Sequence, residues 1–270
     1  MGSIGANVLS ECTFIRLIIL SDGITEIGEK AFYKCRNLET VAIPETITKI
    51  GSFAFAGNGL KSITLPDGLT EIGNGVFCSC RNLESVVIPN SVTKIGSEIF
   101  TQSGLKSIVL PDGLTEIGND VFGCCPNLES VVIPETVTKI GSWAFAYSGL
   151  KSIILPDGWL TEIGENAFIE CSNLETVDMP ETVTKIGRHV FAWSGLKSIA
   201  LPDGLTEIEE GAFYGCGNLE TVVIPETVTK IGPYAFAWSG LKSIILPYQS
   251  TEIDESAFYM CHDLVVKHRN

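Results

Sequence analysis

Nine cysteines and three histidines are the residues of this 270-residue chain best suited to nucleophilic or metal chemistry. No two cysteines have the Cys-x-x-Cys spacing of a zinc site, and two of the histidines, His262 and His268, lie close to the end of the chain. The sequence contains no nucleophile–base–acid constellation and no glycine-rich phosphate loop. It therefore predicts a protein that is not an enzyme and carries no cofactor or metal.

Acidic residues outnumber basic ones by 32 to 18, and the net charge of −14 argues against nucleic acid as a partner. Nine of the acids follow the residue that closes a repeated hydrophobic segment, usually a proline. One interpretation is ordinary turn chemistry, and the other is an acidic edge that binds Ca²⁺ or a basic partner. The candidate acidic edge comprises Asp67, Asp112, Glu135, Asp157, Glu181, Asp203 and Glu226.

Aromatic residues form pairs four residues apart in the C-terminal half of the chain. In a helical turn such pairs share one face. Either the rings fill space between successive turns, or they form an exposed stripe that contacts a protein partner or a second copy. This candidate aromatic stripe comprises Trp143, Tyr147, His189, Trp193, Tyr234 and Trp238.

These side chains are carried by repeat units of 22 or 23 residues, marked by phenylalanines that recur from Phe32 to Phe258. A longer unit (LTEIGNGVFCSCRNLESVVIP, 69–89) alternates with a shorter one (VTKIGSWAFAYSGLKSIILP, 137–156), and one inserted residue, Trp159, interrupts the alternation. Eleven units predict a single domain over 1–270. It divides into an N-terminal partial rung (1–22), the repeats (23–258) and a frayed C-terminal rung (259–270).

Each unit contains an alternating apolar segment, such as Leu83 to Ile88, that predicts a short strand. Stacked units place these strands in parallel about 4.8 Å apart, and the repeated phenylalanines form a continuous buried column. The segment from Gly141 to Tyr147 predicts a short helix or 3₁₀ turn.

The pattern L-x-x-V-x-I-P-x-x-V-T-x-I-G-x-x-A-F-x-x-C, which covers about residues 12–264, resembles BspA-like leucine-rich repeats of bacterial and protist surface proteins. The resemblance implies a right-handed curved solenoid of about 11 rungs, with a parallel sheet on its concave face and short helical or 3₁₀ turns on the other side. It also implies a general binding role at the cell surface or in secreted form. The chain shows no signal peptide or anchor, and its apolar runs are too short for a membrane span.

Two columns of charge alternate in sign along the predicted stack, one from Arg16 to Lys242 and one from Glu26 to Glu252. Exposed cross-strand pairs of this kind contribute about 0.2–1 kcal/mol each. They also fix the register, because a slip by one unit would bring like charges together.

Six cysteines occupy one slot of the longer unit, so successive members lie two rungs apart, about 9–10 Å. That separation is too long for a disulfide, and we expect small buried residues there. Cys12 and Cys35 are the exception, because they fall in adjacent rungs. A disulfide between them and two free thiols remain alternatives.

The predicted concave sheet exposes a column of Ser or Thr beside a column of mostly Val and Ile, with Asp178 as its charged member. Extended solenoid surfaces of this kind bind partners. The sequence therefore predicts a non-catalytic protein–protein interaction scaffold, adhesin-like or a surface recognition module, that binds through the concave sheet or the aromatic stripe. The alternative is a structural protein that forms a homo-oligomer through solenoid ends or faces.

Overall fold

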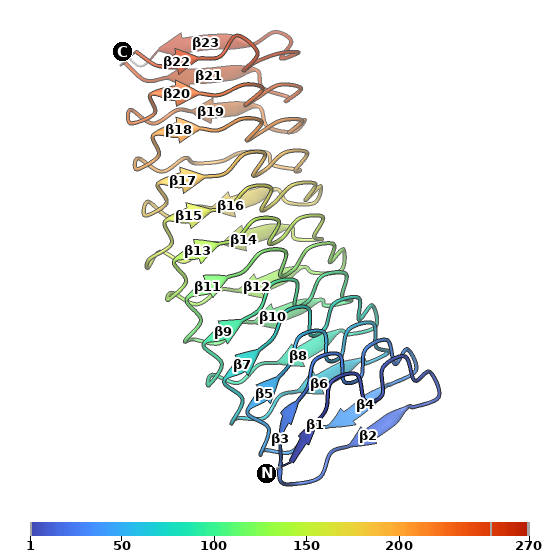
Figure 1. Cartoon of the computed structure of the whole chain (residues 1–270). Helices are drawn as coiled ribbons and strands as arrows, with labels where there is room; N and C mark the ends of the chain where they lie inside the picture. The colour runs from blue at the N-terminus through green and yellow to red at the C-terminus, as the bar shows by residue number, and fades with distance from the viewer. Residues whose placement is uncertain (1, 249, 269–270) are drawn as a thin grey trace.

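The computed structural model describes residues 2–248 and 250–268, which coil into one elongated, curved stack of similar rungs (Figure 1). Successive rungs lie side by side from the N-terminus at one end to the C-terminus at the other. Most repeat units contribute two strands, one on each side of the stack, because their sequence contains two short extended segments separated by turns. The architecture confirms the predicted leucine-rich-repeat solenoid.

One side of the stack consists of very short strands, which form three successive sheets, and most of these strands end in the repeated Lys-Ile or Glu-Ile dipeptide. These strands are β1 (Gly2–Ile4), β3 (Ile24–Ile27), β5 (Lys49–Ile50), β7 (Glu71–Ile72), β9 (Lys94–Ile95), β11 (Glu116–Ile117), β13 (Lys139–Ile140), β15 (Glu162–Ile163), β17 (Lys185–Ile186), β18 (Glu207–Ile208), β20 (Lys230–Ile231) and β22 (Glu252–Ile253).

The other side consists of strands of three or four residues that follow the strand-opening leucine and pair in groups of two or three. They are β2 (Leu17–Ile19), β4 (Thr40–Ala42), β6 (Ser62–Thr64), β8 (Ser85–Val87), β10 (Ser107–Val109), β12 (Ser130–Val132), β14 (Ser152–Ile154), β16 (Thr176–Asp178), β19 (Thr221–Val223), β21 (Ser243–Leu246) and β23 (Val265–His268).

All recorded strand pairs are parallel, and they join equivalent residues of neighbouring rungs. Lys49, for example, pairs with Glu26 on one side and with Glu71 on the other. Opposite charges therefore face each other along the ladder, which confirms the alternating column that the sequence predicts.

The core between the sheets contains the phenylalanine column. From Phe32 to Phe258 neighbouring rings are stacked, with centroids 5.1–6.0 Å apart. The rings of the rungs from Phe32 to Phe236 are fully buried. The predicted buried column is confirmed, and it explains why a single unit of this length needs its neighbours to exclude water.

The turns on the remaining side are not helical, so the prediction of short helices or 3₁₀ turns is wrong. Within the described residues every element is a strand or a turn. Trp143 and Tyr147 have positive φ angles of 61° and 56°, and their amides donate to Glu165 and Ile169 of the following rung. Left-handed residues at alternate bends point these N–H groups along the stack, whereas a helix would direct them back into its own turn.

Candidate interaction surfaces

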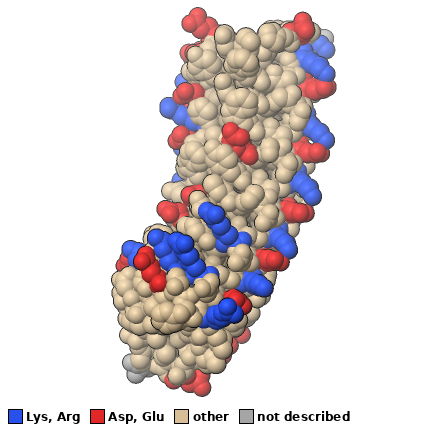
Figure 2. All heavy atoms as spheres, turned by 90° about the vertical axis from the view of Figure 1, so that its right-hand side faces the viewer, with Lys and Arg blue, Asp and Glu red and all other residues tan. Residues whose placement is uncertain are grey.

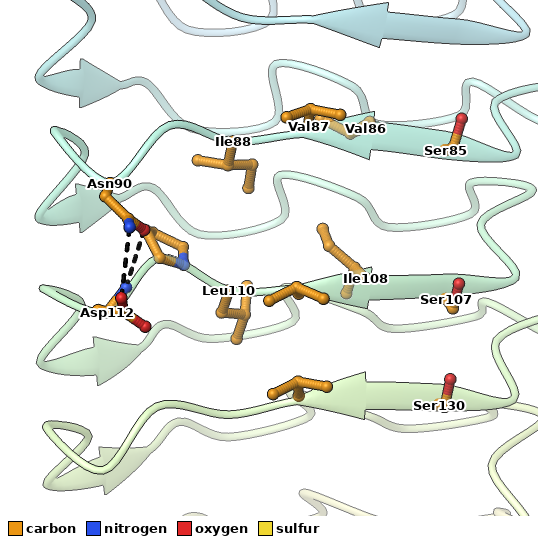
Figure 3. Close-up of a pocket in the computed structure, with 13 residues that line it drawn as sticks. Ser85, Val86, Val87, Ile88, Asn90, Ser107, Ile108, Leu110, Asp112 and Ser130 are labelled. Carbon is orange, nitrogen blue, oxygen red and sulfur yellow. Dashed lines mark hydrogen bonds between the residues drawn. The ribbon is translucent and has the colours of Figure 1, made fainter. Parts of the chain in front are cut away.

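The face formed by the longer strands presents two straight columns of side chains, which we call the Ser/Val face. In Figure 3, Ser85, Ser107 and Ser130 are aligned in one column beside a column of valines. The apolar column is well exposed: Val109 is 65% exposed and Ile154 is 73% exposed. A shallow depression of about 650 Å³ lies over this face. Its floor is apolar, and Asp112 is the charged residue among those that line it.

The acidic edge borders the Ser/Val face, and its Glu side chains are bound to the next rung. Glu181 Oε2 accepts a hydrogen bond of 2.8 Å from the Asp203 amide, and Glu135 Oε2 accepts one of 2.9 Å from the Gly158 amide. Figure 3 shows the equivalent contacts of Asn90 with Asp112. These bonds favour the turn interpretation for the Glu members. Binding of Ca²⁺ or of a basic partner stays a prediction.

The turn face carries the aromatic stripe. Among its members the exposed fraction runs from 42% for Trp143 to 47% for Trp238, while His189 is more covered. The sequence argument for shared faces assumed helical pairs. The two members of each pair instead share a face because both have a left-handed backbone. Figure 2 shows this face, where alternating charges border a surface with few charged side chains in its C-terminal half.

Rings of the stripe lie over glycines of the following rung, a feature that the sequence reasoning missed. A Cβ at Gly215 would be 2.5 Å from Cε3 of Trp193, and a Cβ at Gly211 would be 2.5 Å from Cδ2 of His189. Both glycines have positive φ angles. The sequence contains a signal for this contact, because Gly211 and Gly215 occupy in their unit the positions that His189 and Trp193 occupy in the preceding unit.

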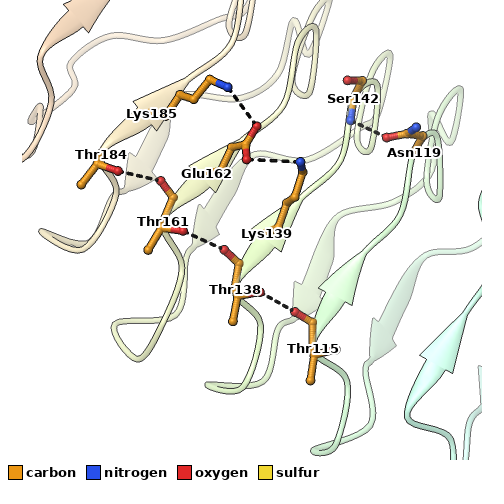
Figure 4. A network of polar contacts seen from close by, with 9 residues as sticks. All are labelled: Thr115, Asn119, Thr138, Lys139, Ser142, Thr161, Glu162, Thr184 and Lys185. Atoms are coloured by element: carbon orange, nitrogen blue, oxygen red, sulfur yellow. Dashed lines mark hydrogen bonds and ion pairs between the residues drawn. The ribbon is translucent and has the colours of Figure 1, made fainter.

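The charge and threonine columns beside the short strands are structural (Figure 4). Glu162 lies 3.2 Å from Lys139 and 3.3 Å from Lys185. Partial burial opposes the charged form of Glu162, but the bonds from the two lysines outweigh it and hold the pKa of this carboxyl below its ordinary value. Thr184 and Thr161 donate their hydroxyls to carbonyls of the preceding rung. These contacts maintain the register of neighbouring rungs.

A basic hollow lies on the N-terminal part of the turn face, and the sequence reasoning missed it as well. Lys34, Arg36 and Arg81 line this hollow of about 520 Å³ together with the buried Asn58. Arg36 and Arg81 occupy the same position of two longer units, and Gly59 lines the hollow with them. Their matching positions in the repeat were the sequence signal for this hollow.

The cysteines of the regular slot are buried from Cys35 to Cys216, which confirms the predicted packing role there, whereas Cys261 is partly exposed. The Cys171 thiol donates to the Phe145 carbonyl at 3.1 Å. Burial raises the pKa of the Cys80 thiol to about 12, and it raises the pKa of Cys171 to about 11. Thiols of this kind are poor nucleophiles and poor metal ligands.

Cys12 and Cys35 are both free thiols in the structure, and the Cys35 thiol donates to the Leu9 carbonyl at 3.0 Å. The disulfide between them stays a prediction. Intact-mass measurement after alkylation, with and without reductant, tests it.

In the part of the chain that the structure describes, no group of three or more His, Cys, Asp or Glu side chains is placed to hold a metal ion. The same residues form no helix of the length and apolarity needed to cross a bilayer. What the arrangement offers is extended surface: a flat Ser/Val face, an acidic edge and an aromatic turn face.

Together the parallel rungs, the buried phenylalanine column and the exposed strand face define a leucine-rich-repeat protein. The family model described as "BspA type Leucine rich repeat region (6 copies)" matches residues 2–129, 115–239 and 161–266. The chain belongs to the BspA-type leucine-rich-repeat family. A search of curated proteins found no match.

Solved structures of bacterial leucine-rich-repeat proteins are similar over nearly the whole chain. A leucine-rich repeat protein from Bacteroides ovatus is 28% identical with a TM-score of 0.59, covering 99% of this chain and 87% of that one. A leucine rich cell surface protein from Faecalibacterium prausnitzii is also 28% identical, with a TM-score of 0.57 and coverage of 95% and 88%. The pneumococcal vaccine antigen PcpA, 22% identical with a TM-score of 0.64, covers 94% of this chain and 69% of its own and shares the fold.

Proposed function

We propose that this chain is a non-catalytic protein-recognition module that binds its partner through the Ser/Val face. The exposed apolar column carries the proposal, because Val87, Val109, Val132 and Ile154 are each 57–73% exposed and follow one another along the stack. Soluble proteins leave contiguous apolar surface of this kind uncovered mainly where a partner binds. Similarity to a protein described as a cell surface protein supports a recognition role for this chain as well.

The chemistry of the partner follows from the margins of this face. The centre offers aliphatic side chains and serine hydroxyls, while Asp112 lies along one border. A flat partner surface with an apolar centre and basic residues on its matching border complements this arrangement. A rigid, straight array also requires little ordering of its own side chains on binding.

A pair of charge-matched variants tests the proposal. Val109→Glu with Val132→Glu places two carboxylates on the Ser/Val face, while Thr93→Glu with Thr115→Glu adds the same charge to exposed positions elsewhere. Immobilised proteins are exposed to cell-surface and secreted protein fractions, and retained proteins are quantified by mass spectrometry. We expect a partner that the wild type and the threonine variant retain and the valine variant loses.

Equal retention by all three proteins would contradict the proposed face. Light scattering coupled to size exclusion addresses the self-association alternative. A dimer of the wild type that the valine variant converts to a monomer would show that the face pairs with a second copy instead.

A further inference from the structure

The turn face carries a second surface that the proposed function does not use. On three rungs, each separated from the next by one intervening rung, aromatic side chains project from two left-handed positions four residues apart. One column of this array contains Tyr147, Trp193 and Trp238. Neighbouring phenylalanine rings from Phe145 to Phe236 are 5.1–5.6 Å apart, so positions two rungs apart repeat at about 10–11 Å.

The Trp193 ring lies flat on the following rung. The side chain of Trp193 covers the Cα of Gly215, where a Cβ would be 2.5–2.9 Å from three ring atoms. Trp193 is 46% exposed and Trp238 is 47% exposed, the fraction expected when one ring face is covered and the other is open. Edge-on contacts with Tyr214 and Tyr259 of the following rungs hold the two indoles at centroid distances of 5.4 and 6.4 Å.

Flat, open rings bind the apolar C–H face of a pyranose sugar by dispersion and weak C–H···π contacts. In an extended β-1,4-linked chain each sugar is turned by about half a revolution relative to the last, so every second sugar presents the same face. The two-rung period of about 10–11 Å is close to this disaccharide repeat. An α-1,4-linked chain coils and cannot keep successive sugars over a straight row of rings.

Charge favours a neutral ligand. Glu170 occupies the position of Tyr147 and Trp193 on the rung between them, and Arg188 near the stripe is paired with Glu210 at 3.6 Å. The whole chain carries a net charge of −14. An anionic polysaccharide would therefore be repelled, whereas a neutral one would find aromatic faces flanked by carboxylate and phenol groups that can bind its hydroxyls.

We propose that the aromatic stripe is a binding platform for a neutral, extended β-1,4-linked polysaccharide, laid along the solenoid axis with alternate sugars on Tyr147, Trp193 and Trp238. This platform is separate from the Ser/Val face. A protein partner on one face and a glycan on the other can bind at the same time.

The test is a titration of the full chain with cellohexaose, mannohexaose and chitohexaose. Binding is monitored by tryptophan fluorescence and by calorimetry. We expect at least one hexasaccharide to bind. The matching disaccharide should bind more than about tenfold more weakly, because it reaches only one ring. Maltohexaose, which is α-linked, should not bind. Absence of binding by all three β-linked hexasaccharides, or equal binding of maltohexaose, would overturn the proposal.

Matched variants locate the site. Trp193→Ala with Trp238→Ala should weaken hexasaccharide binding more than about tenfold, while Trp193→Phe, which keeps a ring, should retain most of it. Trp159→Ala is the control, because Trp159 is 70% exposed in the inserted turn away from this face. Melting curves confirm that each variant is folded. Unchanged affinity of the double variant would overturn the assignment, as would a wild-type dimer that only this variant dissociates.

Discussion

Phe145 lies in the middle of the buried ring column, with Phe122 and Phe168 stacked on its two sides at 5.3 and 5.2 Å. Replacing it with alanine leaves a cavity that neighbouring rungs cannot close without breaking their own ladders. We expect Phe145→Ala to lower the free energy of unfolding by about 3–5 kcal/mol, measured by urea denaturation. Phe258→Ala is the matched control. Because the Phe258 ring is only partly buried, its removal should lower the free energy of unfolding clearly less. Equal losses in the two variants would contradict this view of the core.

Asp120 lies where its surroundings disfavour the ionised form of its carboxyl group. Partial burial, together with repulsion from Glu98 of the preceding rung, raises its pKa to about 6. An unfolded chain binds this proton only near pH 3.9. As the pH falls from 7 to 4, the native protein therefore takes up a proton before the unfolded chain does. The contribution of Asp120 to stability accordingly rises as the pH falls.

Asp120→Asn removes this effect and keeps a side chain that tolerates the left-handed backbone. We expect the variant to be more stable than the wild type at pH 7 and to lose this advantage as the pH approaches 4. Urea denaturation at four pH values measures the difference. Asp157→Asn, at an exposed position of the acidic edge, controls for the general loss of negative charge. An advantage of Asp120→Asn that did not change with pH would refute the assignment.

At the scale of the elements, the longer strands pair mostly in twos: β2 with β4, β6 with β8, β10 with β12, and β14 with β16. This grouping reflects the 45-residue double repeat. The step between two such pairs is 22 residues, whereas the step within a pair is 23 residues, or 24 from β14 to β16, where Trp159 is inserted. Between β12 and β14 the described residues form no strand ladder, but Glu129 and Lys151 meet there at 3.4 Å. Glu84 and Lys106 bridge the equivalent step between β8 and β10 at 2.7 Å.

We therefore expect the ion pairs of this column to matter most at steps without a ladder. Glu129→Lys places three lysines in a row and should lower stability by up to about 1 kcal/mol, less at high salt. Combining it with Lys151→Glu should restore part of the loss. Thermal melts at low and high salt measure both effects. A loss that does not depend on salt would mean that the charge pairing is not the cause.

The elements also show why sequence reasoning succeeded for the strands and failed for the turns. Alternation around Leu83 to Ile88 has a period that only a half-buried strand fits, so strand, register and core followed from the sequence. The turn from Gly141 to Tyr147 has apolar residues at spacings that fit a helix equally well. Which backbone conformation forms depends on hydrogen bonds to the next rung, such as the one that the Phe145 amide donates to the Ala167 carbonyl. A contact of this kind becomes visible only when the rungs are stacked.

The candidate surfaces likewise have features that the sequence predicts and features that it does not. The composition of the Ser/Val face could be predicted, because alternate residues of a strand point to opposite sides. The orientation of the aromatic rings could not, since it depends on the glycines at 211 and 215 and on the left-handed backbone at Trp193. The binding partner depends on shape and period over several rungs, which no single unit specifies.

At the scale of the whole molecule, the ladders, the phenylalanine stacks and most ion pairs of the described residues join neighbouring rungs, so cohesion is local along the stack. Solenoids with this property behave as one-dimensional arrays, in which stability is a sum of rung and neighbour terms. A defect should then destabilise the rungs around it more than distant ones. The tryptophans offer a convenient probe, because they lie at positions 143, 159, 193 and 238, all in the C-terminal half.

Phe77→Ala and Phe236→Ala place equivalent defects in opposite halves of the stack. In Phe77→Ala we expect far-UV circular dichroism to decline at lower urea than tryptophan fluorescence, because the N-terminal rungs open while the tryptophans stay packed. In Phe236→Ala fluorescence should change first or together with circular dichroism. Coincident transitions in both variants would mean that coupling extends well beyond adjacent rungs. A partner bound at one part of the Ser/Val face could then stabilise the entire stack, whereas under local coupling it would stabilise only the rungs that it contacts.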